Sequence, residues 1–192
     1  MMTLDNELLL VFILGCALVA FTILGAIIGV KIYYHLNDRQ RSIVLTSLHS
    51  QLVIYLSESG ASAQTALLHI GTIAQSRSNK NLLIEELLTL ASHFSGLYAE
   101  KIYEIYEHLD LHKLSYQKLN SSSSHQKIKG IQELSSMEYK VAYHDLAKLI
   151  NHKNQDVRRN ARVAIVKIKK KQGLMDLCNL EGVMSQWTFI NI

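Results

Sequence analysis

Two histidines four residues apart, His108 and His112, have a spacing that can bind a metal ion. On a helix this spacing places both imidazoles on one face, where they can share a metal, and Asp110 lies between them. The sequence has no His-Glu-x-x-His motif, and no nearby residue suggests a third ligand. Because exposed polar residues at a helix end explain the pair equally well, we predict no metal site.

Patterns for nucleophilic catalysis and for phosphate binding do not occur in the sequence either. A hydrolase serine sits in a Gly-x-Ser-x-Gly turn, and nucleotide phosphates bind to glycine-rich loops. Neither pattern is present, and the neighbouring His144 and Asp145 do not face each other on a helix. We therefore expect a protein that is not an enzyme, with no catalytic residue, no cofactor and no metal.

Basic residues are concentrated toward the C-terminal end of the chain. Residues 151–171 contain eight lysines and arginines against the single acid Asp156, while the whole chain has a net charge of +4. Seven of them and one tryptophan form the candidate interaction surface: Arg158, Arg159, Arg162, Lys167, Lys169, Lys170, Lys171 and Trp187. A solvated helix face explains this pattern, and the alternatives are an acidic protein, a second copy or lipid headgroups. Nucleic acid is disfavoured, because no aromatic residues for base stacking interleave these basic residues.

A second charged region, residues 80–110, is acidic and contains three tyrosines. Six acidic residues occur there with two lysines, and Tyr98, Tyr103 and Tyr106 are interleaved with glutamates. Positions 98, 102, 105, 106 and 109 can share one stripe of a helix. Core packing explains the tyrosines, and a surface for a protein partner is the alternative.

Helices must position these residues, because the hydrophobic spacing is helical nearly throughout. The chain contains no proline, and leucines at 45, 48, 52 and 56 recur every three or four residues. Gly60 is the expected end of this first helix. Further helices are expected over 63–75, 83–94 and 98–109, with a polar loop at 76–81 and an exposed loop at the serines 121–124. No segment alternates as a strand does, so the expected fold class is all-α.

Near the C-terminus, a helix and a short polar turn precede a second helix that opens with Asp156, Val157 and Arg158. Ala161 lies where two such helices must approach closely. This pattern, over about residues 138–170, resembles a HEAT-type repeat. The resemblance implies that Asp156 caps or favours the helix start, that Val157 packs inward and that Arg158 lies along the groove between repeats. It implies a HEAT-like α-solenoid over 121–192 that binds other proteins.

The longest uncharged run in the chain is residues 8–30. As a helix, its 23 residues span about 34 Å, which suffices to cross a membrane. The basic residues Lys31, Arg39 and Arg41 all follow the run, which places the N-terminus outside and the rest of the chain in the cytoplasm. We therefore expect a single-pass protein of the inner (cytoplasmic) membrane. Gly25 and Gly29 are the candidate helix–helix contact within that membrane.

Four segments are expected: an outer N-terminus (1–7), a transmembrane helix (8–30), a helical region (31–120) and HEAT-like repeats (121–192). Their order resembles bacterial membrane-anchored HEAT-repeat proteins of uncharacterised function. The expected function is a non-catalytic, membrane-anchored scaffold or adaptor for an unknown protein partner. The alternative is a regulatory or structural subunit of a membrane enzyme or transporter complex, assembled through the transmembrane helix. Self-association into a homo-oligomer is also open, and the apolar tail at 186–192 is expected to fold back on the preceding helix.

Overall fold

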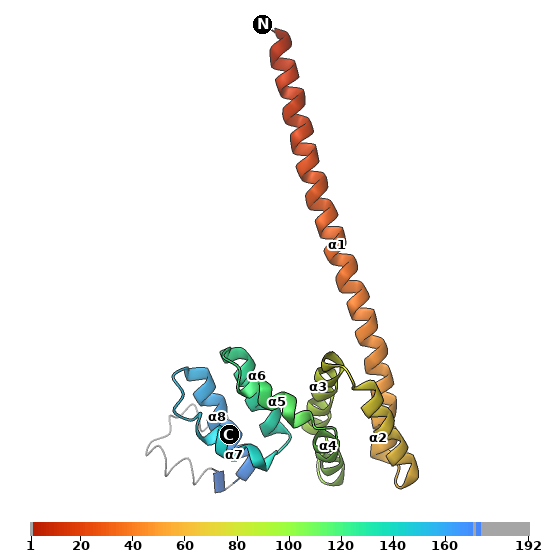
Figure 1. Ribbon diagram of the computed structural model, residues 1–192, viewed down its shortest axis with the longest axis vertical. Helices are drawn as coiled ribbons and strands as arrows, with labels where there is room; N and C mark the ends of the chain where they lie inside the picture. Colours follow the sequence, from red (N-terminus) through yellow and green to blue (C-terminus); the bar gives the residue numbers. More distant parts are fainter. Residues whose placement is uncertain (1, 171, 174–192) are drawn as a thin grey trace. The chain divides into compact units, whose positions relative to one another are not determined.

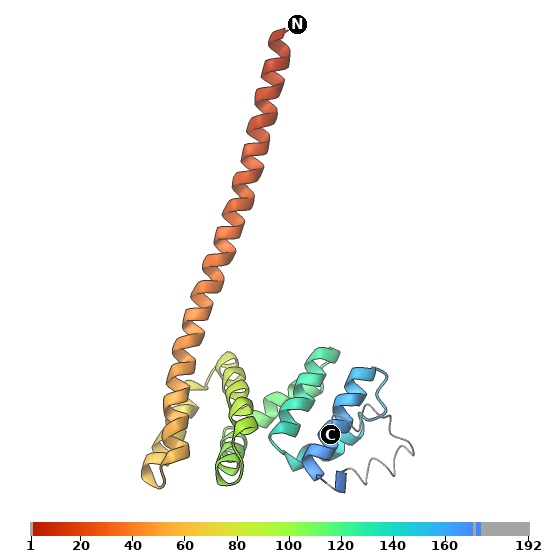
Figure 2. The ribbon, with the colours of Figure 1, turned by 180° about the vertical axis from the view of Figure 1, so that it is seen from behind.

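The computed structural model describes residues 2–170 together with residues 172 and 173. Over this part of the chain, helices are joined by turns and no strand occurs, so the predicted all-helical fold is confirmed. The chain divides into two compact units, Met1–Ser47 and Leu48–Ile192. Figures 1 and 2 show the helices from opposite sides.

The first unit lies within helix α1 (Met2–Ser57), which is continuous and enters the second unit at Leu48. No proline interrupts this helix, so the hydrogen-bond ladder continues through the polar stretch that includes Arg39 and Arg41. Large apolar side chains such as Phe21 and Ile27 are exposed on it.

The predicted transmembrane helix at 8–30 is not supported by the structure. Crossing a membrane requires about 20 consecutive, predominantly apolar residues, so the length of a helix is not sufficient by itself. Within residues 2–170, 172 and 173, no helix combines the length and the apolar character that a span requires. The fold prediction is corrected in this respect, and the predicted single-pass inner-membrane localisation is withdrawn with it.

The second unit begins with the end of α1, where a leucine stripe enters the core. Leu48, Leu52 and Leu56 are buried at four-residue intervals, as their spacing predicts. Gly60 follows with a φ of 76°, a conformation that glycine adopts without steric cost, and α2 (Ala61–Ile73) starts after it. The Lys101 ammonium donates hydrogen bonds to three carbonyl oxygens at the end of α1, at 3.0–3.2 Å.

The next three helices are α3 (Arg77–His93), α4 (Leu97–His108) and α5 (Leu111–Leu119). The predicted polar loop at 76–81 is wrong, because α3 begins at Arg77. Ser76 is its N-cap, and the serine hydroxyl accepts a hydrogen bond from the Asn79 N–H at 3.1 Å. Polar residues after Ser76 therefore form the first turn of a helix.

The C-terminal helices are α6 (Ser124–Ser136), the 3-10 turn η1 (Lys140–Ala142), α7 (Tyr143–Ala147) and α8 (Gln155–Lys169). The most extensive packing joins α6 to both α5 and α8, and α6 and α8 lie side by side in both ribbon views (Figures 1 and 2). Val157, Ala161 and Ile165 of α8 are fully buried in the core that these helices share. Ala161 thus occupies the close contact that its position predicts.

The start of α8 fits in part the pattern that the HEAT resemblance implies, because Asp156 lies in the first turn, where a carboxylate favours a helix, but is not the N-cap. Its N-cap is Asn154, whose side-chain oxygen accepts hydrogen bonds from the N–H groups of Asp156 and Val157 at 2.9 and 3.2 Å. The Asp156 carboxylate instead pairs with Arg159. The Arg158 guanidinium donates to carbonyl oxygens of the turn before α8, at 2.7 and 3.0 Å. The Arg158 side chain is therefore bound to the turn that directly precedes α8.

Candidate functional site

The second unit contains a groove of about 740 Å³. One wall is the end of α3 and one face of α4, and the other is the segment 137–141 that follows α6, together with Lys170. Glu100, Tyr103 and Glu107 recur at intervals of three and four residues, so they share that face of α4. We call this cavity the α4 groove.

The turn after α6 places Tyr139 in the groove. Glu138 adopts the left-handed conformation with a φ of 45°, and the Tyr139 N–H donates to the Leu134 carbonyl oxygen at 3.0 Å. This is the pattern in which a left-handed residue closes a helix C-terminus, a position where glycine is usual. The turn reverses the chain and brings Glu138 and Tyr139 opposite α4.

Aromatic rings pack around Tyr139 and fix its orientation. Its ring stacks on His112 with centroids 5.0 Å apart, and it meets Tyr106 and Tyr116 edge-on at 6.4 and 6.3 Å. Tyr106 is buried, whereas Tyr103 and Tyr139 are half-buried. Such aromatic contacts hold rings in defined positions. The groove therefore presents one partly exposed ring, that of Tyr139, whose position is already fixed by its neighbours.

Carboxylates outnumber ammonium groups in the groove. Glu100, Glu107 and Glu138 line it, against Lys140 and Lys170. Lys170 Nζ lies 3.6 Å from Glu138 Oε2. Burial raises the pKa of the Tyr103 phenol, and the negative field of Glu138 raises it further. Burial likewise raises the pKa of the Tyr139 phenol, and the negative charge of Glu107 raises it further by a smaller amount.

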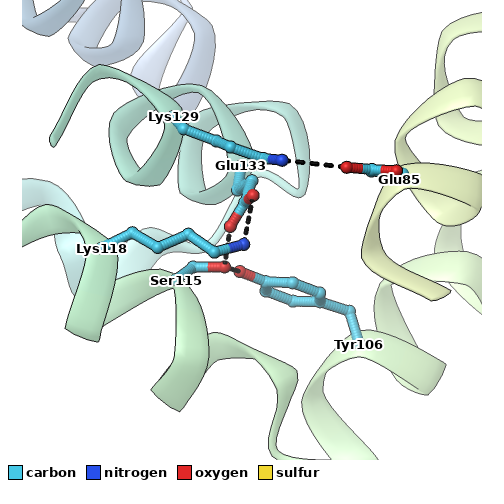
Figure 3. Close-up of polar contacts among 6 residues, drawn as sticks. All are labelled: Glu85, Tyr106, Ser115, Lys118, Lys129 and Glu133. Atoms are coloured by element: carbon cyan, nitrogen blue, oxygen red, sulfur yellow. Dashed lines mark hydrogen bonds and ion pairs between the residues drawn. The ribbon is translucent and has the colours of Figure 1, made fainter. Parts of the chain in front are cut away.

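A buried polar network holds the floor of the groove (Figure 3). The Tyr106 hydroxyl donates to Ser115 Oγ at 2.8 Å, and the Ser115 hydroxyl donates to Glu133 Oε2 at 2.7 Å. Glu133 Oε1 pairs with Lys118 Nζ at 2.6 Å. Burial raises the pKa of Tyr106 strongly, although its hydrogen bond with Ser115 opposes this shift. Because Ser115 and Glu133 are buried, no substrate can reach them, and the network positions Tyr106.

Two further features support this network. A Cβ on Gly130 would lie 2.5 Å from the Leu119 backbone nitrogen, so glycine is needed where α6 crosses α5. Figure 3 also shows Lys129 of α6 reaching Glu85 of α3, with Nζ 2.9 Å from the carboxylate. The network therefore joins α4, α5 and α6, and an ion pair connects α6 to α3.

The predicted basic surface lies on α8, and much of it is engaged within the chain. Arg158 is bound to its turn, Arg159 pairs with Asp156, and Lys169 Nζ lies 3.7 Å from the centroid of the Tyr143 ring. Arg162 is half-buried, and Lys167 is exposed. Lys170 belongs to the α4 groove. The structure thus brings one of the predicted basic residues to the groove, while several of the others serve local contacts.

The remaining predicted residues lie elsewhere. Lys171 and Trp187 are outside the described residues, as is the tail at 186–192. Gly25 and Gly29 lie on α1 in the first unit, with open space around each, and their predicted contact within a membrane is withdrawn with the span. His112 stacks on Tyr139, and its Nε2 lies 3.7 Å from Asp110.

The sequence predicted the helix that forms one wall of the groove and missed the other wall. It favoured core packing for Tyr98, Tyr103 and Tyr106, with a partner surface as the alternative. Of the tyrosines, Tyr106 is in the core as predicted, whereas Tyr98 is 47% exposed. The opposite wall depends on the left-handed turn at Glu138. A glutamate in the sequence does not predict this backbone conformation.

No protein-family model matches the chain, and neither a curated protein sequence nor a solved structure gives a match.

Proposed function

We propose that the unit Leu48–Ile192 is a non-catalytic, protein-binding module of the α-solenoid type, acting as a scaffold or adaptor. The observation that carries this proposal is the α4 groove, which is about 740 Å³ in volume and is lined by the partly exposed Tyr103 and Tyr139, of which Tyr139 is held in place by neighbouring rings. Tyrosine supplies large contact area at low entropic cost and is enriched where proteins bind one another.

Exposed apolar side chains near the groove support the same function. Phe94 and Val141 line the groove and are 43% and 68% exposed, and Leu97 and Tyr98 lie next to Phe94 at the start of α4. The Phe94 and Tyr98 rings lie 5.7 Å apart. Such clusters of exposed apolar side chains are typical of surfaces that bind a partner.

The helix pair formed by α7 and α8 supports the repeat architecture. Its core face carries Val157, Ala161 and Ile165 at the intervals expected of a repeat helix, and α8 packs on α6. The cap at Asn154 and the shortness of α7 depart from the HEAT pattern. We therefore propose a HEAT-like unit with an altered first helix. The alternative function, assembly through a membrane helix, depended on the withdrawn span and is not retained.

Site-specific photo-crosslinking tests the proposed function. A photoreactive amino acid at Val141 of the full chain, introduced in cells that naturally make the protein, should yield discrete products with another protein. The matched position is Gln117, which is exposed on α5 and does not line the groove. Equal products from both positions, or none from Val141, would refute a binding role for the groove.

A further inference from the structure

We infer that the α4 groove binds a lysine- or arginine-bearing segment of the partner protein and holds it by the cationic side chain. This inference rests on the proposed function and names the chemistry of the partner. It follows from aromatic faces and carboxylates that occur together in one groove.

The aromatic part of the site is formed by Tyr103 and Tyr139. Both are half-buried and line the groove, and a Lys or Arg side chain is attracted to the face of such a ring within about 6 Å. Because Tyr139 is already held by Tyr106, Tyr116 and His112, a guest does not have to order it. Less ordering on binding leaves more of the interaction energy for affinity.

The charge of the groove selects a cation over other guests. Glu100 and Glu107 form no ion pair within the part of the chain that the structure describes, and both line the groove. An acidic segment would be repelled by these carboxylates, and a purely apolar segment would desolvate them without a partner. A guanidinium or ammonium group avoids both the repulsion and the uncompensated desolvation, since it pairs with carboxylates and packs on aromatic faces.

The chain itself places two ammonium groups at this groove, those of Lys140 and Lys170. Lys170 Nζ lies 3.6 Å from Glu138 Oε2, and the Lys170 side chain is 75% exposed. A contact this long and exposed contributes little stability, so an incoming cation can displace it. Residues 174–192 contain no lysine, arginine or histidine, so that segment does not supply the cation.

The test uses the full chain with labelled tyrosine rings, observed by nuclear magnetic resonance. The probes are three acetylated and amidated glycine–serine peptides of equal length that differ only in a central pair of arginines, lysines or glutamates. The arginine and lysine peptides should shift the Tyr103 and Tyr139 signals, which Tyr103→Phe and Tyr139→Phe identify. The glutamate peptide should leave them in place, and added salt should weaken the response.

We expect variants of the acidic and basic residues in the groove to change the affinity for the arginine peptide in opposite directions. The double variant Glu100→Gln/Glu107→Gln should weaken binding of the arginine peptide by about five- to tenfold, as expected for two exposed charges. Lys170→Gln should strengthen it by about two- to threefold, because it removes a competing cation. Glu58→Gln is the matched control, since Glu58 is exposed and does not line the groove, and it should change nothing.

Three outcomes would overturn the inference. They are equal binding of the glutamate peptide, no change with the charge variants, and self-association of the chain through the groove in place of peptide binding. If the Val141 crosslinker captures a protein but the cationic peptides do not bind, the inference fails and the proposed function stands. If the cationic peptides bind but Val141 captures no protein, the proposed function fails.

Discussion

The ion pair between Lys118 and Glu133 gives a quantitative test of the network behind the groove. The two side chains are 8% and 1% exposed, with 2.6 Å between Nζ and Oε1. Removing one partner of a buried pair leaves the other charge without compensation, which costs about 3–5 kcal/mol. Replacing both partners with apolar residues of similar size is often close to neutral.

The structure predicts unequal costs for the two single variants. Lys118→Met leaves the Glu133 carboxylate buried with only the Ser115 hydroxyl as a donor, so we expect a loss of about 3 kcal/mol in the free energy of unfolding. Glu133→Leu leaves an ammonium group on a long flexible stem that can reach water, so we expect a smaller loss of about 2 kcal/mol. The double variant should lie within about 1 kcal/mol of the original chain.

Urea unfolding of the full chain and the three variants measures these values, with far-ultraviolet circular dichroism as the signal. The expected coupling energy is about 4–6 kcal/mol, well above the few tenths expected of independent sites. Additive single effects, or a double variant less stable than either single variant, would refute the assignment of this pair as a buried, coupled network.

Three further predictions concern the helices around the groove. Gly130→Ala should destabilise the chain by about 3 kcal/mol or more in urea unfolding, because the new Cβ would lie 2.5 Å from the backbone of α5. Gly71→Ala is the control and should change stability by less than about 1 kcal/mol, because its Cβ would meet only the end of a leucine side chain at 3.4 Å. The raised pKa of Tyr106 favours the neutral phenol in the folded state, so its contribution is complete below pH 10 and is lost as the pH rises above that value; Tyr106→Phe should make the alkaline loss of stability shallower. Asn154→Ala should cost about 1 kcal/mol in thermal unfolding through loss of the helix cap, and Asp156→Ala should cost less, whereas a cap at Asp156 would give the opposite order.

The helices of the second unit were largely predictable from spacing, because buried positions repeat with the helical period. Leu48, Leu52 and Leu56 on α1 and Val157, Ala161 and Ile165 on α8 follow that period and are buried. The start of α3 was missed because polar residues after Ser76 look like a loop until the serine is recognised as a cap. Length and apolar composition at 8–30 predicted a membrane span, which the described residues do not support.

The groove could be predicted only in part, because its two walls are distant in sequence. Tyr103 and Glu107 share a face of α4, which helical spacing predicts. Tyr139 joins them through a left-handed turn at Glu138, where no glycine marks the position. The basic residues of α8 were the stronger sequence signal, yet Arg158 and Arg159 make local contacts that charge counting does not show.

The most direct test of the central claim compares the α4 groove with the basic face of α8 as the binding surface. The measurement is the Kd between the full chain and the protein that crosslinks to the photoreactive amino acid placed at Val141. Titration calorimetry determines this Kd. Val141→Arg places a positive charge at an exposed groove position and should raise the Kd by at least about tenfold, equivalent to about 1.4 kcal/mol. Lys167→Ala, on the exposed part of α8, should change the Kd by less than about twofold. The opposite order, with Lys167→Ala disruptive and Val141→Arg neutral, would contradict the claim that the groove binds the partner.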